Sequence, residues 1–219
     1  MKKAVVAAFQ KNSANQMRTE FISGIRTHQS TFGLELADDA IERLADYYDL
    51  IQQHNEFLHL VGPSTPEEFA TRHILESLTL LEYLPRDIWF ADVGTGAGLP
   101  SIPCILARED LKAVLVESKE KKSKFLKLAV EQLRLKHRTR ISPTQFSETN
   151  LGHCEAVTCR ALDKFTEKLP ALIKWSGKSK LLFFGGENLK KALEGQNVVF
   201  RKKLMPMSEQ RFLFVAKVI

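Results

Sequence analysis

The pattern of apolar and polar positions divides the chain into two parts. From residue 38 to about residue 85, apolar side chains recur at three- and four-residue steps, the period of helices that bury one face. From residue 88 onward, short apolar runs alternate with helical stretches. This order predicts an N-terminal helical extension over residues 1–85 and an α/β domain, one compact unit, over residues 86–219.

The helical part contains recognisable start signals. A weak pattern indicates a helix near residues 16–28, and a stronger one begins at Asp38, which we expect to cap its helix. The four residues from Thr65 to Glu68 read Thr-Pro-Glu-Glu, the order of a capping box with proline at the first helical position. We therefore expect a further helix from residue 66.

Seven strands are predicted in the second part. They cover residues 88–92, 113–117, 140–143, 156–159, 179–184, 197–203 and 210–218. Helical stretches separate the first five, which favours parallel neighbours, whereas the last two are close enough to pair as an antiparallel hairpin. The expected fold is α/β, with a mostly parallel seven-stranded sheet and helices on both faces.

The first of these strands runs into a glycine-rich segment. Residues 92–99 read Asp-Val-Gly-Thr-Gly-Ala-Gly-Leu. Glycine permits close approach of the backbone to a ligand, and the start of the following helix is expected to present free N–H groups. The dinucleotide fingerprint requires a third glycine where Leu99 stands. The spacing instead resembles the S-adenosylmethionine loop of Rossmann-like methyltransferases, although a purely structural turn would use the same glycines.

A second element lies at a suitable distance from this loop. The next apolar strand ends at Glu117, 23 residues after Gly94. In a βαβ unit this places the carboxylate at the carboxyl edge of the sheet, where it can accept both hydroxyls of a ribose. A solvated loop acid would also explain Glu117 alone. The two elements together predict a site for a nucleoside cofactor.

Composition restricts the remaining possibilities. The chain has 219 residues, 44% hydrophobic, with no apolar run long enough for a membrane span and no signal-peptide core. Its three cysteines form no C-x-x-C pair, and no metal-ligand cluster is recognisable. We expect a cytoplasmic protein, a monomer, without a metal or a membrane contact.

Charge points to the class of substrate. The net charge is +6, and nine Lys or Arg residues fall between Lys119 and Arg140, against Glu120 and Glu131. A solvated helix face is the ordinary meaning of such a run. Because this one begins just after Glu117, it would surround the opening of the cofactor site, which favours a polyanionic substrate such as RNA.

Several segments together resemble one family. They are Arg-His-Ile-Leu-Glu-Ser at 72–77, Asp-Val-Gly-Thr-Gly-Ala-Gly-Leu-Pro at 92–100, Glu117-Ser118 followed by Lys121 and Lys-Phe-Leu at 124–126, and Cys-Arg-Ala at 159–161. In this order and spacing the chain resembles, over about residues 38–219, the bacterial small-subunit (16S) ribosomal RNA guanine-N7 methyltransferases, also called glucose-inhibited division protein B. The resemblance implies a Rossmann-like class I methyltransferase fold, S-adenosyl-L-methionine as cofactor, and 16S ribosomal RNA or the small ribosomal subunit as partner.

The resemblance and the strand ends together assign candidate site residues. Arg160 and Arg211 are the candidate catalytic residues. Candidate RNA contacts are Lys121, Lys122, Lys124, Arg72 and His73. Candidate cofactor contacts are Asp92, Gly94, Thr95, Gly96, Gly98, Leu99, Glu117, Ser118, Gln145, Phe146 and Arg160. For His73, a role as a buried interhelical histidine remains an equal alternative.

The chain departs from the family pattern at several positions. Ala97 and Ser101 replace a common proline and glycine, His59 replaces an asparagine, Phe146 stands where an acid is usual, and Gly185 replaces a lysine. These changes surround the substrate and the adenine, which identifies a divergent member. Two alternatives therefore stay open, a methyltransferase of another RNA or of an acidic protein, and a catalytically silent RNA-binding relative.

Overall fold

The protein is built around one seven-stranded sheet. The computed structural model describes residues 2–160 and 162–219, with the side chains of the first helix from Asn12 onward. The strand order is β3-β2-β1-β4-β5-β7-β6, with β1 to β5 parallel and β7 antiparallel to both of its neighbours. The strands are β1 (Trp89–Val93), β2 (Lys112–Val116), β3 (Thr139–Ser142), β4 (Cys154–Arg160), β5 (Lys180–Gly185), β6 (Val198–Leu204) and β7 (Phe212–Val218). The prediction of a mostly parallel sheet with a terminal hairpin is confirmed.

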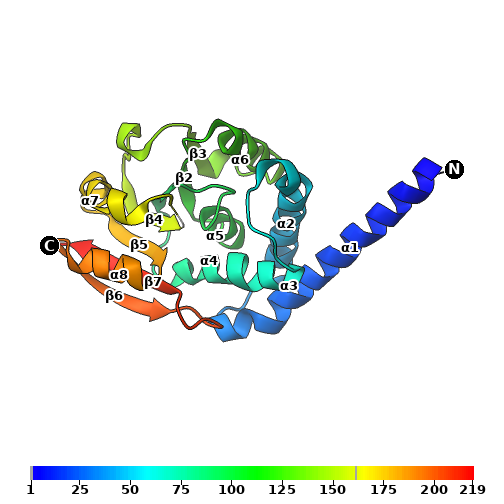
Figure 1. Ribbon diagram of the computed structural model, residues 1–219, viewed down its shortest axis with the longest axis horizontal. Helices are drawn as coiled ribbons and strands as arrows, with labels where there is room; N and C mark the ends of the chain where they lie inside the picture. The colour runs from blue at the N-terminus through cyan, green and yellow to red at the C-terminus, as the bar shows by residue number, and fades with distance from the viewer. Residues whose placement is uncertain (1, 161) are drawn as a thin grey trace.

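Helices precede the sheet and connect its strands (Figure 1). The helices are α1 (Lys2–His28), α2 (Asp38–Leu58), α3 (Pro66–Glu68), α4 (Glu76–Leu78), α5 (Ser101–Ala107), α6 (Glu120–Gln132), α7 (Phe165–Ser176) and α8 (Glu187–Glu194). A π-helical segment, Phe69–Leu75, joins α3 to α4, so that residues 66–78 form one continuous helical rod. None of the helices described combines the length and the apolar character required to cross a bilayer.

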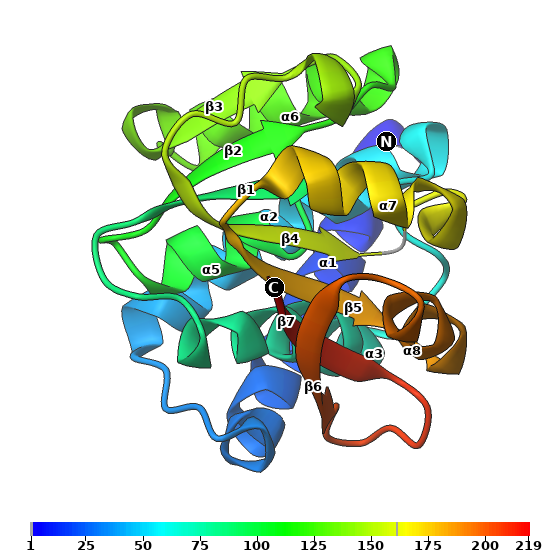
Figure 2. The ribbon, with the colours of Figure 1, turned by 90° about the vertical axis from the view of Figure 1, so that its left-hand side faces the viewer.

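The helices cover both faces of the sheet (Figure 2). On one face α7 and α8 contribute Leu169 and Leu193 to a core that also contains Val157 of β4. On the other face α5 and α6 share a larger core with the helices that precede β1, and this core includes both Leu44 of α2 and Phe90 of β1. The N-terminal helices therefore pack directly on the α/β part, while the beginning of α1 extends away from the body of the molecule (Figure 1).

Of two local predictions for the helical part, one is wrong and one is confirmed. The N-cap of α2 is Ala37 rather than Asp38, so that prediction is wrong; Asp38 is the first helical residue and pairs with Arg26 at 2.9 Å. Its charge still lies at the helix start, where carboxylates are favourable. The capping box is confirmed, because the Glu68 N–H donates to Thr65 Oγ1 at 3.1 Å and the Thr65 N–H donates to Glu68 Oε2 at 2.9 Å.

The strand register positions the candidate site. Val93 of β1 is the partner of Val116 on β2 and of Cys159 on β4. The residues that follow each of them are Gly94, Glu117 and Arg160. These three groups therefore reach the carboxyl edge of the sheet at the same level, where α/β proteins bind ligands.

Candidate functional site

The glycine-rich loop after β1 is folded around a buried carboxylate. Asp92 is fully buried, and its Oδ2 accepts hydrogen bonds from Thr95 Oγ1 at 2.6 Å, from Ser101 Oγ at 2.7 Å and from the Ser101 N–H at 3.3 Å. Its Oδ1 is buried without a hydrogen-bond partner among the described residues. Burial raises the pKa of Asp92 to about 7, against the opposing effect of these hydrogen bonds. Asp92 thus holds the loop in place through its hydrogen bonds with Thr95 and Ser101.

Two glycines of this loop have a backbone conformation and close neighbours that disfavour a side chain. Gly94 has φ +69°, and a Cβ there would lie 2.6 Å from Leu162 Cδ1. Gly98 has φ +100°, and its Cβ would overlap the side chain of Ile102. The left-handed backbone favours glycine at both positions, and at Gly98 the packing also excludes a Cβ, whereas at Gly94 the end of the Leu162 side chain could move aside.

The start of α5 does not present the free amides expected from the sequence. The N–H groups of Gly98 and Leu99 donate to the Thr95 carbonyl at 2.8 and 3.0 Å, and the Ser101 N–H donates to Asp92. The expectation of free N–H groups at this helix start is wrong, since the loop uses these donors to fix its own shape.

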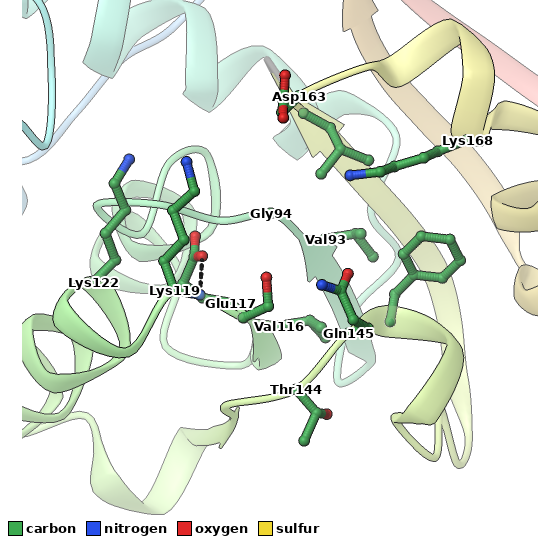
Figure 3. A pocket seen from close by; sticks show the side chains of 13 residues that line it. Val93, Gly94, Val116, Glu117, Lys119, Lys122, Thr144, Gln145, Asp163 and Lys168 are labelled. Atoms are coloured by element: carbon green, nitrogen blue, oxygen red, sulfur yellow. Dashed lines mark hydrogen bonds between the residues drawn. The ribbon is translucent and has the colours of Figure 1, made fainter.

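Glu117 is held in place by backbone amides at the end of β2. Its side chain is buried, with Oε2 accepting from the Gly96 N–H at 3.0 Å and Oε1 accepting from the Lys119 N–H at 2.8 Å. A carboxylate oxygen has two lone pairs, so each oxygen keeps capacity for a further donor. Figure 3 shows this carboxylate at the side of a hollow formed by the strand ends.

A first cavity of about 240 Å³ lies at this edge of the sheet. Five predicted cofactor residues line it: Gly94, Glu117, Ser118, Gln145 and Phe146. Gln145 and Phe146 belong to the segment after β3, and the side chain of Phe146 is buried. The cavity therefore has an acidic acceptor on one side and an apolar ring on another.

Three charged residues of this cavity were not among the site residues predicted from the sequence. Lys119, Asp163 and Lys168 also line it, and Figure 3 shows Asp163 and Lys168 across the hollow from Lys119. Asp163 follows β4 by three residues, so the strand-end argument used for Glu117 would have found it. Lys168 lies on α7. No sequence motif shows which side of α7 faces the cavity, so Lys168 could not be predicted.

A second cavity, of about 250 Å³, adjoins the first. Its walls come from Leu60 and Val61 after α2, from His73, and from the loop residues Thr95, Gly96, Ala97 and Leu99, together with Arg160. Both cavities are lined by Gly94 and Lys122. Neither alone reaches the roughly 300–1,000 Å³ of ordinary ligand sites, but together they do.

Arg160 lies in the wall of the second cavity with its terminal nitrogens already engaged. Nη2 donates to the Arg72 carbonyl at 2.6 Å and approaches Glu76 Oε2 at 3.4 Å. Nη1 donates to Ser77 Oγ at 3.3 Å and to the His73 carbonyl at 3.5 Å. The π-helical hydrogen-bond pattern over this segment departs from the α-helical ladder, and Arg160 binds two of its carbonyls. Arg160 therefore joins β4 to the helical rod.

Glu76 connects the two candidate catalytic arginines. Its side chain is 2% exposed, and Oε1 accepts from Arg211 Nε at 2.8 Å and lies 2.6 Å from Arg211 Nη2, while Oε2 faces Arg160. Arg211 remains 38% exposed in this arrangement and Arg160 only 16%. A buried carboxylate of this kind needs its charged partners, so removing one of the three disturbs the other two.

His73 is uncharged at neutral pH. Burial lowers its pKa to about 3, and the nearby charges of Arg160, Arg72 and Arg211 act in the same direction. Its ring packs against Phe69, with 4.9 Å between ring centroids, and it also lines the second cavity. The structure thus buries His73 against a ring of its own helical rod and also places it in the cavity wall, while its role as an interhelical histidine stays a prediction.

The predicted RNA-binding lysines differ in their placement. Lys122 is half-buried and faces both cavities, with its Nζ 3.8 Å from where a Cβ of Gly96 would lie. Lys121 and Lys124 are exposed, and Lys124 pairs with Glu120 at 2.6 Å. The described residues 2–160 and 162–219 hold no group of three or more His, Cys, Asp or Glu side chains able to bind a metal ion.

Solved structures with the same architecture show the class of fold. A protein of the NADB-Rossmann superfamily from Streptococcus agalactiae matches with a TM-score of 0.56 and 14% identity, covering 65% of this chain and 68% of that one. A ribosomal protein L11 methylase from Lactobacillus delbrueckii subsp. bulgaricus matches with a TM-score of 0.54 and 14% identity, covering 68% and 79%. The chain has a Rossmann-like methyltransferase fold.

Sequence relatives identify the family. The GidB family, described as rRNA small subunit methyltransferase G, matches residues 40–213. A protein named ribosomal RNA small subunit methyltransferase G from Sorangium cellulosum is 33% identical over 168 residues, covering 73% of this chain and 69% of the relative. One of the same name from Acinetobacter baumannii is 32% identical over 155 residues, covering 69% and 73%. The chain belongs to the GidB family and is a methyltransferase, which confirms the resemblance found in the sequence.

Proposed function

We propose that this protein transfers a methyl group from S-adenosyl-L-methionine to N7 of a guanine in small-subunit 16S ribosomal RNA. The observation that carries the proposal is the pair of adjoining cavities that meet at Gly94 and Lys122. One holds the ribose-type acceptor Glu117, and the other is bordered by His73 and Arg160. The family membership supplies the class of reaction, and the basic α6 supports a polyanionic substrate.

The residues of the first cavity fit the proposed cofactor. Glu117 would accept the ribose hydroxyls, with the carboxylate already oriented by the Gly96 and Lys119 amides. Phe146 would pack beside the adenine, and Gly94 permits close approach of the backbone. When bound, S-adenosylmethionine supplies an electrophilic methyl group. Asp92, whose Oδ1 lacks a partner among the described residues, would act at the amino-acid end through the loop it anchors.

The second cavity fits an acceptor that brings its own lone pair. Guanine N7 carries no proton, so its attack on a methyl group needs no general base. The pKa of His73, near 3, leaves the imidazole uncharged and adds no cation where the purine becomes positive. Positioning then supplies most of the acceleration, for which aligned reactants gain roughly 7–11 kcal/mol.

The two arginines would share the task of positioning the base. Arg160 fixes the helical rod against β4 through its terminal nitrogens, and so shapes the cavity wall. Arg211 is more exposed while held by Glu76 and lines neither cavity, so we assign it a contact with RNA beside the bound guanine. Both therefore act by geometry rather than by proton transfer.

The decisive experiment is transfer of labelled methyl from S-adenosylmethionine to RNA and to small subunits from cells that lack this protein, followed by nucleoside analysis. N7-methylguanine in 16S RNA is the expected product. Label in another RNA or in protein would favour a different substrate. Cofactor binding without any transfer would favour the silent RNA-binding relative. We further infer a cytoplasmic location, since the proposed substrate is ribosomal, and the monomer stays a prediction from the sequence.

A further inference from the structure

One aromatic side chain is openly exposed close to the proposed substrate cavity. Phe57 of α2 leaves 76% of its surface exposed, and the other large hydrophobic residues exposed in the described part of the chain are all aliphatic. Exposed apolar side chains are common and a single one requires no function. The fixed helix end that carries Phe57 and the basic helix α6 that lies beside α2 distinguish this one.

Phe57 is mounted on a rigid helix end. His59 ends α2 in the left-handed region, at φ +46°, and its N–H donates to the Asn55 carbonyl at 2.9 Å. The Asn55 side chain then binds Val61 twice, donating to its carbonyl at 3.1 Å and accepting from its N–H at 3.0 Å. The segment on both sides of Phe57 is thus fixed, so that the phenyl ring is presented from a pre-organised support.

Helix α2 runs antiparallel to the basic helix α6. Near the end of α2, the His54 ring lies 5.7 Å from the ring of Phe125. Nearer its start, Asp46 shares a surface hollow with Leu133, which follows the end of α6. Later positions on α2 therefore lie beside earlier positions on α6.

This arrangement brings Phe57 to the same end of the molecule as the first lysines of α6. Phe57 is one turn beyond His54, and Lys121 and Lys122 are one turn before Phe125. Lys122 lines the second cavity together with Leu60, three residues after Phe57. The exposed ring therefore lies on the end of α2 from which the chain runs into the wall of the cavity proposed to receive the guanine.

We propose that Phe57 stacks on an unpaired RNA base that neighbours the target guanine. The inference rests on the proposed function. Aromatic rings beside cations are the usual means of holding single-stranded RNA, since every base offers a face for stacking. The neighbouring Glu56 is exposed and would repel a phosphate, which leaves a base as the group met by this end of α2. Lys121 would contact the adjacent backbone.

Four surface variants test the stacking without disturbing the fold. Phe57→Ala and Phe57→Leu should weaken binding of 16S RNA from cells lacking the protein by about five- to 150-fold, the ratio that corresponds to 1–3 kcal/mol for one stacked base. Phe57→Trp should bind as the wild type does. Val199→Ala, which shortens another exposed apolar side chain at the far strand β6, is the matched control and should change nothing. Affinity for S-adenosylmethionine should be unaltered in all four.

A spectroscopic measurement separates stacking from simple apolar contact. In Phe57→Trp, RNA should quench the added indole fluorescence beyond any change from Trp89 and Trp175 in the wild type. RNA binding by Phe57→Leu equal to the wild type, or no added quenching in Phe57→Trp, would overturn the inference. If Phe57→Ala weakens RNA binding but the wild type transfers no methyl group, the proposed function is refuted and the stacking contact stands without a target guanine beside it.

Discussion

Three buried carboxylates surround the site, and the partners of each differ. Glu117 is held by backbone amides, Glu76 by two guanidinium groups, and Asp92 by hydroxyls with one oxygen left alone. Amides leave a carboxylate oriented yet able to accept more donors. Guanidinium groups neutralise it, and hydroxyls fix a loop. The partner type therefore distinguishes a ligand acceptor from a positioning group and from a loop anchor.

Replacing Glu117 should abolish most of the cofactor affinity. Glu117→Ala removes two charge-assisted hydrogen bonds to the ribose, each worth roughly 1.5–3 kcal/mol, so the dissociation constant for S-adenosylmethionine should rise by at least about a hundredfold. Titration calorimetry measures it. Glu120→Ala, an exposed acid three residues later that pairs only with Lys124 in the described structure, is the matched control. Equal affinity in the two variants would contradict the site.

Replacing Arg160 should slow turnover while sparing cofactor affinity. Its four contacts hold the helical rod against β4, and a small misplacement of reactants can cost about a hundredfold in rate. Arg160→Ala should lower single-turnover methylation by about that factor. Arg160→Lys should recover little, because a point charge cannot reach the separate acceptors that the planar fork binds. A near-normal rate in Arg160→Ala would refute this role.

At the scale of elements, the parallel strand ends made much of the site predictable. Gly94 and Glu117 each follow a strand and Arg160 is the last residue of one, and the register places them at one level. The contacts between different helices and strands could not be predicted, because no sequence motif contains them. The carbonyls that bind Arg160 come from a π-helical segment, and the rotation of α7 that brings Lys168 into the first cavity depends on packing. Such contacts are tertiary, so they have no local signal.

The basic helix α6 should bind RNA through its phosphates. Neutralising Lys121, Lys122 and Lys124 together by glutamine should reduce the slope of log affinity for RNA against log salt by about 0.7–0.9 for each phosphate that a lysine no longer neutralises. Because Lys124 is paired with Glu120 and Lys121 is exposed, the three contributions need not be equal. The control variant replaces Lys178, Lys191 and Lys217 by glutamine, which is an equal change of charge elsewhere on the chain. An identical slope in both triple variants would show that α6 takes no special part.

At the scale of the whole molecule, the N-terminal helices and the glycine loop are physically joined. Tyr47 of α2 is fully buried and its hydroxyl donates to the Ala97 carbonyl at 2.9 Å. Leu44 and Phe69 belong to the same core as Phe90 of the first strand. The loop that forms the cofactor cavity is therefore held by two buried side chains, Asp92 at the end of β1 and Tyr47 of α2. The division of the chain at residue 85 stays a prediction.

Two buried titratable groups should give the stability of this molecule opposing dependences on pH. The pKa of Asp92, raised from 3.8 to about 7, means that the folded protein binds more protons than the unfolded chain between these values, so this group's contribution to stability falls as pH rises. The pKa of His73, lowered from 6.5 to about 3, has the reverse effect, and its contribution rises with pH over that window. In the wild type the two slopes partly offset each other.

Asp92→Asn should therefore steepen the rise of stability with pH between about 4 and 6.5, because it leaves the effect of His73 unopposed. The amide can still accept from Thr95 and Ser101, so the loop keeps its anchor while losing the titration. His73→Gln should do the opposite and leave stability falling from about pH 4 to 7. Urea unfolding at several pH values measures both slopes. Since only the slopes are compared, a uniform loss of stability in either variant does not affect the result. Parallel curves for Asp92→Asn and the wild type would show that Asp92 does not titrate in this range, and the loop would then be anchored by a carboxylate that stays charged.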